Sequence, residues 1–419
     1  MVETQAYGGH GMKTAADQST ALERATRAHP PQPPLHKGGK GSTSHGALAG
    51  AACTSALSST ASWLASRSQN PTDSGAVFLH APSFAFQAAG GGENQLVQTG
   101  IYLEELGVPV RLFSPWTDRL EAARVLHLFG MSREGLELAR IAHKRKVPVV
   151  LSPICWYEPR ALAALERGLT RKLASLAGWS LRSIAPAVPS WRREMLHLAD
   201  VVLPNSRSEA NQLVRLFGVS RERTRVVPNG VSPSIATASP DLFHARWGAG
   251  PFVLFVGRIE PRKNPLALIK AVRGLGLPLV VIGEAPPGCE EYERLCRRAG
   301  GSHVSWVGRL DHHDPVLASA YTAARVFALA SWFETPGLAA LEAGLAGCPI
   351  TITPFGSTRD YFGDLVQYAR PDREPEIRRA VMKCWEDGPD ARLSRSIATS
   401  YLWPNVAQIT AEVYDQVAR

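Results

Sequence analysis

Short apolar runs rich in β-branched residues alternate with helix-length amphipathic segments from residue 76 onward. In the first half the runs are residues 76–80, 108–113, 125–130 and 147–153, separated by amphipathic segments at 94–106 and 133–144. In the second half the runs are residues 252–257, 278–283, 304–308, 324–330, 349–354 and 365–369, with helical segments at 265–274, at 290–299 and from residue 337. Strand-length runs separated by helices predict right-handed crossovers and parallel sheets covered on both faces. We therefore expect an α/β fold of two Rossmann-like, doubly wound halves.

The composition shifts along the chain suggest where these halves begin and end. Residues 41–70 contain 21 Ser, Ala, Thr or Gly and show no period that could bury a face, so we expect residues 1–72 to form a disordered, low-complexity arm. Ser, Pro and Ala interrupt any regular pattern at 232–241, which predicts a linker. The expected domains are residues 73–235 and 248–400, followed by a terminal helical segment at 401–419.

Overall composition narrows the class of protein. Hydrophobic residues make up 45% and charged residues 20% of the 419 residues, which is typical of a globular chain. The apolar stretches fall short of the roughly 18–20 residues that cross a bilayer. The first residues also lack the charged-then-apolar plan of a secretory signal, so we expect a cytoplasmic protein. Six cysteines without a CxxC pair indicate neither a zinc site nor a disulfide framework, and we expect reduced packing residues and no metal.

The net charge of +9 leaves nucleic acid, a membrane surface and an anionic small ligand open as partners. No signature of an RNA- or DNA-binding module accompanies the charge, so we expect no nucleic-acid partner. The helical stretch from Glu158 to Glu194 concentrates seven Lys or Arg against three Glu, interleaved with Leu and Trp. Such a surface could rest on anionic lipid, and a solvated helical face would explain the same residues.

Two loops that follow predicted strands carry residues suited to phosphate. Gly91 and Gly92 precede the first helix, where glycine lets the backbone approach a ligand and a helix start favours an anion, although a plain surface turn has the same pattern. Arg258 and Lys263 share the loop VGRIEPRKN. A planar guanidinium and a mobile ammonium on one loop suit a diphosphate, and a solvated charged loop is the alternative.

The most specific pattern is SWFETPGLAALEAGLAG, residues 331–347. Glu334 ends an apolar strand, Pro336 and Gly337 open a helix, and Glu342 follows about a turn and a half later. Free amides at the helix start can bind phosphate, and the carboxylates can accept hydrogen bonds from sugar hydroxyls. Two isolated glutamates would more often be surface residues, but the apolar strand and small-residue helix around them predict burial.

Two histidines stand near predicted strand ends of the first half. His80 ends the first run and His127 lies inside VLHLFG. Either could face a ligand, although a lone histidine at such a position is more often a hydrogen-bonded core residue.

Several of these motifs occur together in the order found in one family. Residues 90–113, 201–219, 226–231, 252–272, 331–350 and 353–362 resemble the retaining, nucleotide-sugar-dependent glycosyltransferases of family 4 (group 1). The resemblance runs from about residue 76 onward and implies the GT-B fold, in which two Rossmann-like domains face each other across a cleft. It implies an acceptor domain at 73–235, a nucleotide-sugar domain at 248–400 and a final helix, near 403–417, that crosses back to the first domain.

The resemblance also implies roles for the residues that match the family's motifs. Arg258 and Lys263 correspond to the pair that neutralises the donor diphosphate, Glu334 to a carboxylate near the donor sugar, and Glu342 to one near the ribose. Gly91 and Gly92 correspond to the loop that approaches the phosphates, and the amides of the segment Thr335, Pro336, Gly337 and Leu338 complete the anion site. The chain departs from the family at Thr335 and Pro336, where Gly and an aromatic residue are usual.

A second departure concerns the acceptor side. The family often has a histidine after the fourth strand, where this chain has Ser152, Cys155 and Trp156. The candidates for the acceptor site are therefore His127, His80 and Trp156. The resemblance implies transfer of a sugar to a hydroxyl of a glycan, a lipid-linked molecule or a small molecule, in cell-surface polysaccharide or glycoconjugate synthesis. It also implies that the reaction needs neither a cofactor nor a metal. The alternative is a catalytically silent scaffold that binds glycans or nucleotide sugars.

Overall fold

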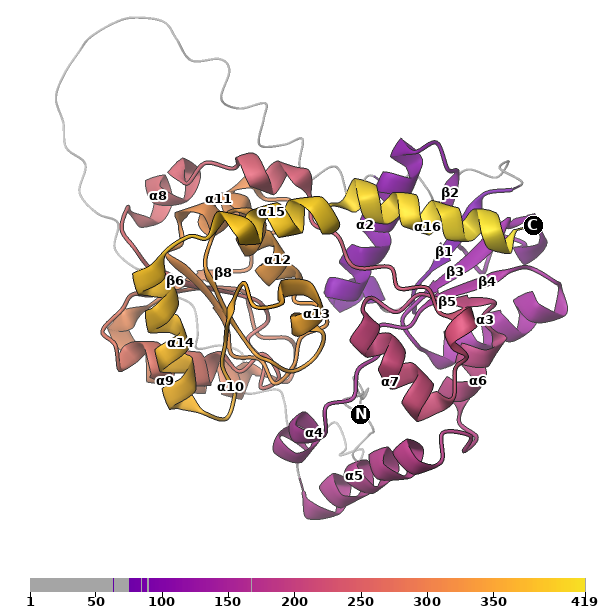
Figure 1. The fold of residues 1–419 in the computed structure, drawn as a ribbon, viewed down its shortest axis with the longest axis horizontal. Coiled ribbons are helices and arrows are strands. Elements are labelled where there is room, and N and C mark those ends of the chain that lie inside the picture. The colour runs from indigo at the N-terminus through magenta and orange to yellow at the C-terminus, as the bar shows by residue number, and fades with distance from the viewer. Residues whose placement is uncertain (1–62, 64–74, 84, 89, 167, 419) are drawn as a thin grey trace, which may run out of the picture. The chain divides into compact units, whose positions relative to one another are not determined.

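The structure is a computed structural model that describes residues 63, 75–83, 85–88, 90–166 and 168–418 (Figure 1). Apart from Trp63, the predicted arm at 1–72 lies outside the described residues. The Trp63 ring is buried, its indole nitrogen donates to Glu104 Oε2 at 2.7 Å, and a Cβ on Gly100 would lie 2.3 Å from the ring. Trp63 therefore belongs to the core of the first half, which the Ser- and Ala-rich residues around it did not indicate.

The first sheet contains five parallel strands in the order β2–β1–β3–β4–β5. They are β1 Val77–His80, β2 Val110–Leu112, β3 Val125–Phe129, β4 Val149–Ser152 and β5 Val201–Val202. The helices of this half are α2 Gly91–Glu105, α3 Arg133–Lys144, α4 Pro159–Leu165, α5 Leu169–Ile184, α6 Trp191–Leu198 and α7 Arg207–Phe217, with 3-10 turns at Ala85–Ala88, Leu120–Ala122 and Arg221–Arg223. Val77 pairs with Val110 on one side and with Val125 on the other, so the strand order reverses direction at β1.

The second sheet contains six parallel strands in the order β11–β10–β9–β6–β7–β8. They are β6 Val253–Val256, β7 Leu279–Ile282, β8 Val304–Gly308, β9 Val326–Leu329, β10 Ile350–Ile352 and β11 Gln367–Tyr368. Its helices are α8 Asp241–Trp247, α9 Pro265–Arg273, α10 Glu290–Gly300, α11 Pro315–Ala323, α12 Leu338–Leu345, α13 Thr358–Phe362, α14 Glu374–Asp387 and α15 Ala391–Ser400, with 3-10 turns at Pro233–Thr237 and Gly301–His303. The order turns back between β6 and β9, and such a switch point is where open α/β sheets bind ligands.

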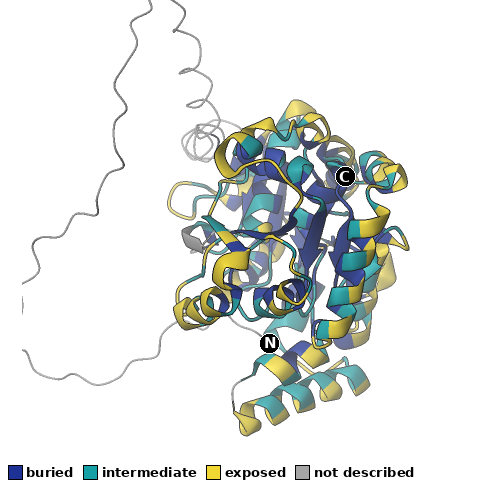
Figure 2. Cartoon of the chain, turned by 90° about the vertical axis from the view of Figure 1, so that its left-hand side faces the viewer, coloured by how far each residue is buried: buried dark blue, intermediate teal, exposed yellow. Residues whose placement is uncertain are grey.

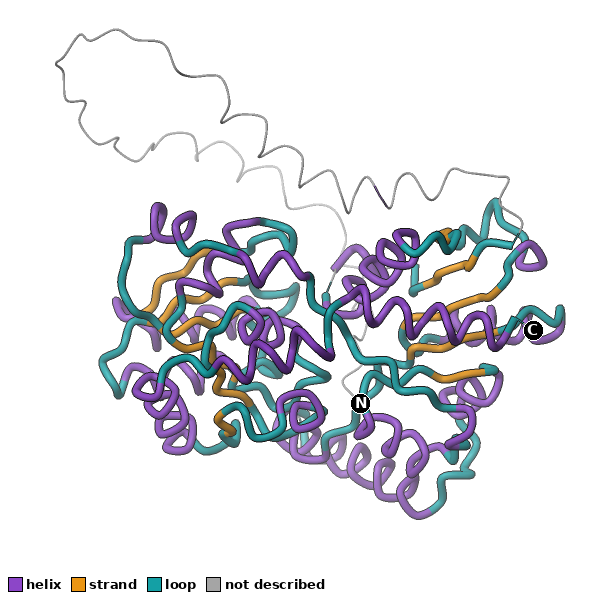
Figure 3. The backbone as a smooth tube through the Cα atoms, turned by 45° about the horizontal axis from the view of Figure 1, so that its top comes forward, coloured by secondary structure: helices purple, strands orange, loops and turns teal. Residues whose placement is uncertain are grey.

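Both sheets are covered on their two faces, which explains why their strands are continuously apolar. In β1, Val77 and Leu79 join one buried cluster while Phe78 joins another on the opposite face. Figure 2 shows the strands in dark blue and the outer helix faces in yellow, and Figure 3 shows the strands flanked by helices. The predicted α/β architecture of two doubly wound halves is confirmed.

Helix α16, Trp403–Val417, belongs to the first half although it follows the second in the chain. Its Tyr414 hydroxyl lies 2.6 Å from His127 Nδ1, and its Trp403 ring stacks on Tyr102 with centroids 6.5 Å apart. In Figure 1 it runs beside α2. The predicted crossing helix is therefore present, and it supplies core residues to a sheet more than 200 residues upstream in the chain.

A tyrosine of α13 links the two halves at a second place. The Tyr361 hydroxyl donates to the carbonyl of Asn205 at 2.6 Å and accepts from the backbone N–H of Asn229 at 3.0 Å. Next to it, Asp360 Oδ2 accepts from the Ser208 N–H at 2.7 Å. These are hydrogen bonds to main-chain groups, so they tie the halves together at the backbone.

Two further findings concern the lengths of the helices and the state of the cysteines. None of the described helices has the length and apolar character needed to span a membrane. Cys155, Cys296, Cys348 and Cys384 are free thiols that are buried or partly buried.

The bond between Tyr414 and His127 gives a test of how α16 stabilises the first half. Tyr414→Phe removes the hydroxyl and leaves a nitrogen of the fully buried His127 ring without a partner, so we expect the free energy of unfolding to fall by about 1–3 kcal/mol. Urea denaturation followed by circular dichroism measures this loss. Tyr401→Phe is the control, because its exposed bond to the Asp360 carbonyl should contribute much less. Equal losses in the two variants would contradict this account.

Candidate functional site

The loops that follow β6 and β9 meet at the switch point of the second sheet. Asn264 Nδ2 donates to the Ala330 carbonyl at 3.1 Å, and the Trp332 N–H donates to the Arg262 carbonyl at 2.9 Å. Asn264 has φ 52°, a left-handed conformation that asparagine tolerates better than most residues, and it directly precedes α9. These bonds hold the two loops in a fixed register, so that charged residues on one loop face those on the other.

Lys263 and Glu334 form a buried ion pair between these loops. Lys263 Nζ lies 2.7 Å from Oε1 and 2.9 Å from Oε2 of Glu334, and Ser331 Oγ donates to Oε1 at 2.5 Å. The two side chains are 17% and 4% exposed. Burial would raise the pKa of the Glu334 carboxyl, but the charges of Lys263 and Arg262 and the hydrogen bonds it accepts hold that pKa below its usual value. The carboxylate is therefore ionised at neutral pH.

A third loop fixes the backbone of Glu334. The Glu334 N–H donates to the Phe355 carbonyl at 3.1 Å, and the Ser357 N–H donates to the Glu334 carbonyl at 2.8 Å. Gly356 between them has φ +96°, and a Cβ there would lie 1.9 Å from the Glu334 carbonyl oxygen. Only glycine fits this contact. The next peptide bond, from Thr335 to Pro336, is cis.

Arg258 lies on the same loop as Lys263 but pairs with a different carboxylate. Its Nη2 atom lies 3.5 Å from Glu260 Oε1, and the Arg262 guanidinium lies 3.0 Å from the same oxygen. The Arg258 side chain is 43% exposed, whereas that of Glu260 is 13% exposed. The structure thus brings Lys263 to Glu334 and leaves Arg258 beside Glu260, a residue that the sequence analysis did not single out.

Helix α12 begins directly after this ion pair. Gly337, with φ 92°, precedes its first residue, and no side chain caps the helix. One turn further, Glu342 is buried, as the flanking apolar pattern predicted, and its Oε2 accepts a hydrogen bond of 2.6 Å from the Tyr321 hydroxyl. The uncapped start presents free amides at the positive end of the helix dipole.

A histidine pair after β8 joins this helix to the glycine-rich loop of the first half. His312 Nδ1 lies 3.4 Å from Glu342 Oε1, and its Nε2 lies 3.2 Å from the side-chain nitrogen of Asn94 on α2. The neighbouring His313 contacts Gln98, also on α2, at 3.4 Å. With the Asn94 amide donating to Nε2, a neutral His312 ring carries its proton on Nδ1, the nitrogen that faces Glu342. Neither histidine was among the predicted site residues, although their place just beyond a strand end was a usable signal.

The predicted glycines lie close to these elements. A Cβ on Gly91 would lie 3.6 Å from Leu338 Cδ1, the first residue of α12, and a Cβ on Gly92 would lie 3.3 Å from Ile154 Cδ1. Gly91 and Gly92 form the first turn of α2, the helix that also carries Asn94. The structure therefore brings Gly91, Leu338, Glu342 and, through His312, Asn94 into one neighbourhood.

The two histidines proposed from the sequence have other surroundings. His127 is 1% exposed, with Nδ1 bonded to Tyr414 and Nε2 lying 2.9 Å from Ser152 Oγ, and burial lowers its pKa to about 3. It is a neutral core residue with no exposed edge, and we leave it out of the proposed site. His80 ends β1 with Nε2 3.8 Å from Glu134 Oε1, and burial lowers its pKa while Glu134 opposes that effect.

Trp156 lies half-buried in the loop that follows β4. Glu209 on α7 fixes this loop: its two carboxylate oxygens accept the N–H groups of Cys155 at 2.6 Å and Asn205 at 2.7 Å. Burial raises the pKa of Glu209 to about 7. The sequence signal for this residue is the capping pair Ser206-x-x-Glu209, in which Ser206 Oγ accepts the Glu209 N–H at 3.0 Å.

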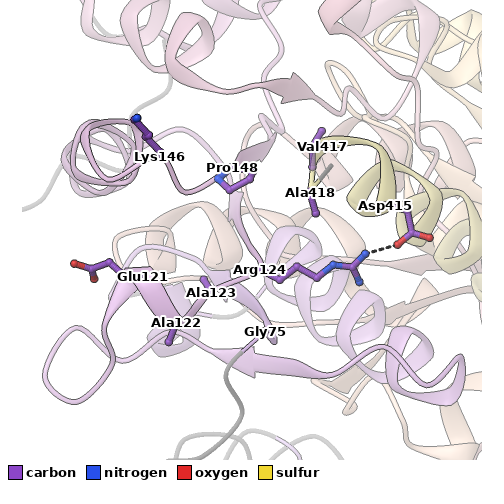
Figure 4. Close-up of a pocket in the computed structure, with 10 residues that line it drawn as sticks. All are labelled: Gly75, Glu121, Ala122, Ala123, Arg124, Lys146, Pro148, Asp415, Val417 and Ala418. Carbon is purple, nitrogen blue, oxygen red and sulfur yellow. Dashed lines mark hydrogen bonds and ion pairs between the residues drawn. The ribbon is translucent and has the colours of Figure 1, made fainter.

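A pocket of about 860 Å3 lies at the amino ends of strands of the first sheet (Figure 4). Its lining comes from residues that precede β1, β3 and β4 and from the end of α16, and Arg124 and Asp415 form an ion pair there. Parallel α/β sheets bind their ligands at the carboxyl ends of the strands. This pocket lies at the amino ends, and it holds none of the residues proposed for the site.

The site also bears on the expectation that the protein holds no metal. Among the described residues, no group of three or more His, Cys, Asp or Glu is arranged to hold a metal ion.

The buried ion pair gives a test of how the site is held. Lys263→Met removes the cation and leaves Glu334 buried without it, so we expect the free energy of unfolding to fall by about 3–5 kcal/mol at neutral pH. Chemical denaturation measures the loss. Lys383→Met is the matched control, because its pair with Asp387 is exposed and screened by solvent and should contribute far less to stability. A loss at Lys263 no larger than that at Lys383 would show that the pair does not stabilise these loops.

Comparison with known proteins covers both halves of the chain. Residues 89–235 match the family model for Glycosyltransferase Family 4, and residues 244–395 match that for Glycosyl transferases group 1. The D-inositol 3-phosphate glycosyltransferase of Xylanimonas cellulosilytica is 32% identical over 254 residues, which is 54% of this chain and 59% of that protein. The match thus spans less than two thirds of that relative.

Two solved structures share the architecture. The sucrose-phosphate synthase of Thermosynechococcus elongatus has a TM-score of 0.66 at 19% identity and covers 82% of this chain and 98% of its own. HepE of Anabaena in complex with UDP has a TM-score of 0.60 at 18% identity, with 82% and 100% covered. Together with the two matched family models, this architecture shows that the chain belongs to the group 1, family 4 glycosyltransferases and has the GT-B fold.

Proposed function

We propose that the protein is a retaining glycosyltransferase that moves a sugar from a nucleoside-diphosphate sugar to a hydroxyl acceptor. The observation that carries the proposal is the arrangement at the switch point, where Lys263, Glu334 and the uncapped start of α12 lie together. The family supports the reaction class. HepE, which shares the fold, was solved with UDP and with UDP and glucose, which supports a nucleotide-sugar donor.

The diphosphate of the donor would bind at the start of α12. The backbone amides of Thr335, Gly337 and Leu338 and the helix dipole favour an anion there, and Gly337 and Gly91 present no side chain that would block its approach. Proline at 336 has no N–H to offer, so it contributes shape to this site and no hydrogen bond.

Lys263 would act on the diphosphate while it holds Glu334. An ammonium has three N–H donors, and the two oxygens of Glu334 account for two of them. The third can turn toward a phosphate oxygen. Arg258 adds a more exposed positive charge whose flexible side chain can leave Glu260 for the diphosphate.

The two buried carboxylates would hold the sugar and the ribose. Glu334 is ionised at neutral pH and follows β9 at the switch point, which suits acceptance of hydrogen bonds from donor-sugar hydroxyls. Glu342 accepts a hydrogen bond from the Tyr321 hydroxyl and has His312 Nδ1 3.4 Å from its other oxygen, so its orientation would be set before a ribose arrives. Asn94 extends this arrangement to the first half of the chain.

In the proposed reaction the bond between the anomeric carbon and the diphosphate oxygen breaks, and the acceptor oxygen forms a bond to that carbon from the same face. The acceptor proton passes to the departing diphosphate. Lys263, Arg258 and the α12 amides stabilise the negative charge that gathers there, so the proposal requires no resident metal. The acceptor would be a glycan, a lipid-linked molecule or a small molecule, with transfer taking place in the cytoplasm during polysaccharide or glycoconjugate synthesis.

A donor panel tests the proposed function. UDP-, GDP- and ADP-sugars are added to the full chain in buffer that contains EDTA, and thermal melting and release of nucleoside diphosphate are both measured. We expect one nucleotide class to raise the melting temperature by mass action and to be turned over without added metal. Binding without release would favour the catalytically silent scaffold, and dependence of turnover on added metal would contradict the metal-free reaction.

Arg258→Gln tests the role of the exposed cation. Loss of one stabilising contact to the leaving group typically lowers kcat by roughly a hundredfold to a thousandfold, and we expect a loss in that range. The control is Arg273→Gln, an exposed arginine at the far end of α9 whose guanidinium donates to the backbone carbonyl of Ala299. Turnover by Arg258→Gln at the level of the control would exclude the assigned role.

A further inference from the structure

The two carboxylate oxygens of Glu342 have different surroundings. Oε2 accepts the Tyr321 hydroxyl at 2.6 Å, and burial raises the pKa of that phenol well above its usual value, so the phenol keeps its proton and donates it. Oε1 faces His312 Nδ1 at 3.4 Å. The Glu342 side chain is 7% exposed and that of His312 is 31% exposed. The second half therefore fixes one oxygen with a buried hydroxyl and turns the other toward a ring that solvent reaches.

The His312 ring is in turn held from the first half of the chain. Its Nε2 lies 3.2 Å from the side-chain nitrogen of Asn94. Asn94 stands in the first turns of α2, and the start of this helix is fixed by the Gly90 N–H, which donates to Glu93 Oε2 at 2.8 Å. A fixed helix start in one half thus meets, through one ring, a buried carboxylate in the other.

An imidazole ring transmits the state of one nitrogen to the other. A neutral ring carries one proton, so a donor at Nε2 leaves that proton on Nδ1. With the Asn94 amide at Nε2, the Nδ1 proton faces Glu342 Oε1 and attracts it. Without Asn94, the ring can carry its proton on Nε2 and turn a lone pair toward the carboxylate, which repels it. Asn94 therefore selects the state of the ring in which Glu342 is held.

The next residue makes a similar contact between the halves that ends elsewhere. His313 Nε2 lies 3.4 Å from Gln98 Nε2, one turn further along α2. Within the described part of the chain, neither His313 nor Gln98 forms a hydrogen bond or an ion pair with Glu342. The two contacts join the same loop to the same helix, so one serves as a reference for the other.

We propose that His312 is a positioning residue for the donor's ribose, through which Asn94 of the first half orients the Glu342 carboxylate of the second. Nucleotide affinity then depends on a first-half residue that lies behind the ring and not on the ribose itself. The inference rests on the proposed function in one respect, because it takes Glu342 as the group that accepts hydrogen bonds from the ribose hydroxyls.

Nucleotide binding tests this proposal. Binding of UDP, GDP and ADP and of their 2′,3′-dideoxy counterparts to the full chain is measured by isothermal titration calorimetry in buffer that contains EDTA. We expect the wild-type chain to bind one ribonucleotide about tenfold more tightly than its dideoxy form, because the dideoxy form has no ribose hydroxyl to donate to Glu342.

Variants of the bridge should change this preference in a defined way. His312→Leu and Asn94→Leu should each lower the affinity for the ribonucleotide by about tenfold and leave that for the dideoxy form unchanged. The double variant should lose no more than either single variant, since both changes break one connection. His312→Gln should keep most of the preference, because a side-chain amide also offers one donor group and one acceptor.

The matched control is Gln98→Met, which removes the neighbouring contact between the halves and should leave both affinities unchanged. Thermal melting of every variant is followed in parallel. A role in stability alone would lower the melting temperature and would weaken binding of the ribonucleotide and the dideoxy form together.

The proposal would be overturned if Gln98→Met lost as much ribonucleotide affinity as Asn94→Leu, or if Asn94→Leu and His312→Leu bound both nucleotide forms as the wild type does. Equal wild-type affinity for the two forms would also overturn it, while the proposed reaction would stand. If the wild type bound none of the three nucleotides, the proposed function would fail and this inference with it.

Discussion

The ion pair between Lys263 and Glu334 is the interaction on which the site depends. It joins the loops that follow β6 and β9, the two strands between which the order of the second sheet turns back. A carboxylate that is 4% exposed can remain ionised there only because a cation and a hydroxyl compensate for the lost water. The same contacts fix the start of α12 relative to the backbone of Glu334. They therefore determine both the charge and the geometry of this region.

The second sheet alone does not complete the site. Glu342 reaches the first half through His312 and Asn94, and the Gly91 turn lies next to Leu338. Away from the site, Tyr361 and α16 tie the halves together through main-chain hydrogen bonds and packing. The contacts of Asn94 and Gln98 with the two histidines are polar and only partly buried, whereas those of Tyr414 and Trp403 on α16 are buried.

The apolar pattern predicted the strands and most helices because a parallel sheet covered on both faces leaves a continuous signal. The amphipathic segment at 133–144 matches α3 residue for residue, and the final helix that the family resemblance implied near 403–417 matches α16. The apolar pattern could not predict the surroundings of His127. A histidine at a strand end gives the same sequence signal whether it faces a ligand or, as here, a tyrosine from a helix 287 residues away. His312 was missed because its role depends on a partner in the other half.

Helix α16 has a consequence for how the chain is made. Trp403, Val406, Val413 and Tyr414 belong to the same buried cluster as Val77 and Leu79 of β1, and a Cβ on Gly230 would lie 2.5 Å from the Trp403 ring. During synthesis these aromatic and aliphatic side chains leave the ribosome after every strand of both sheets. The half that is translated first is therefore the half that is finished last, and one side of its sheet stays open until α16 arrives to close it.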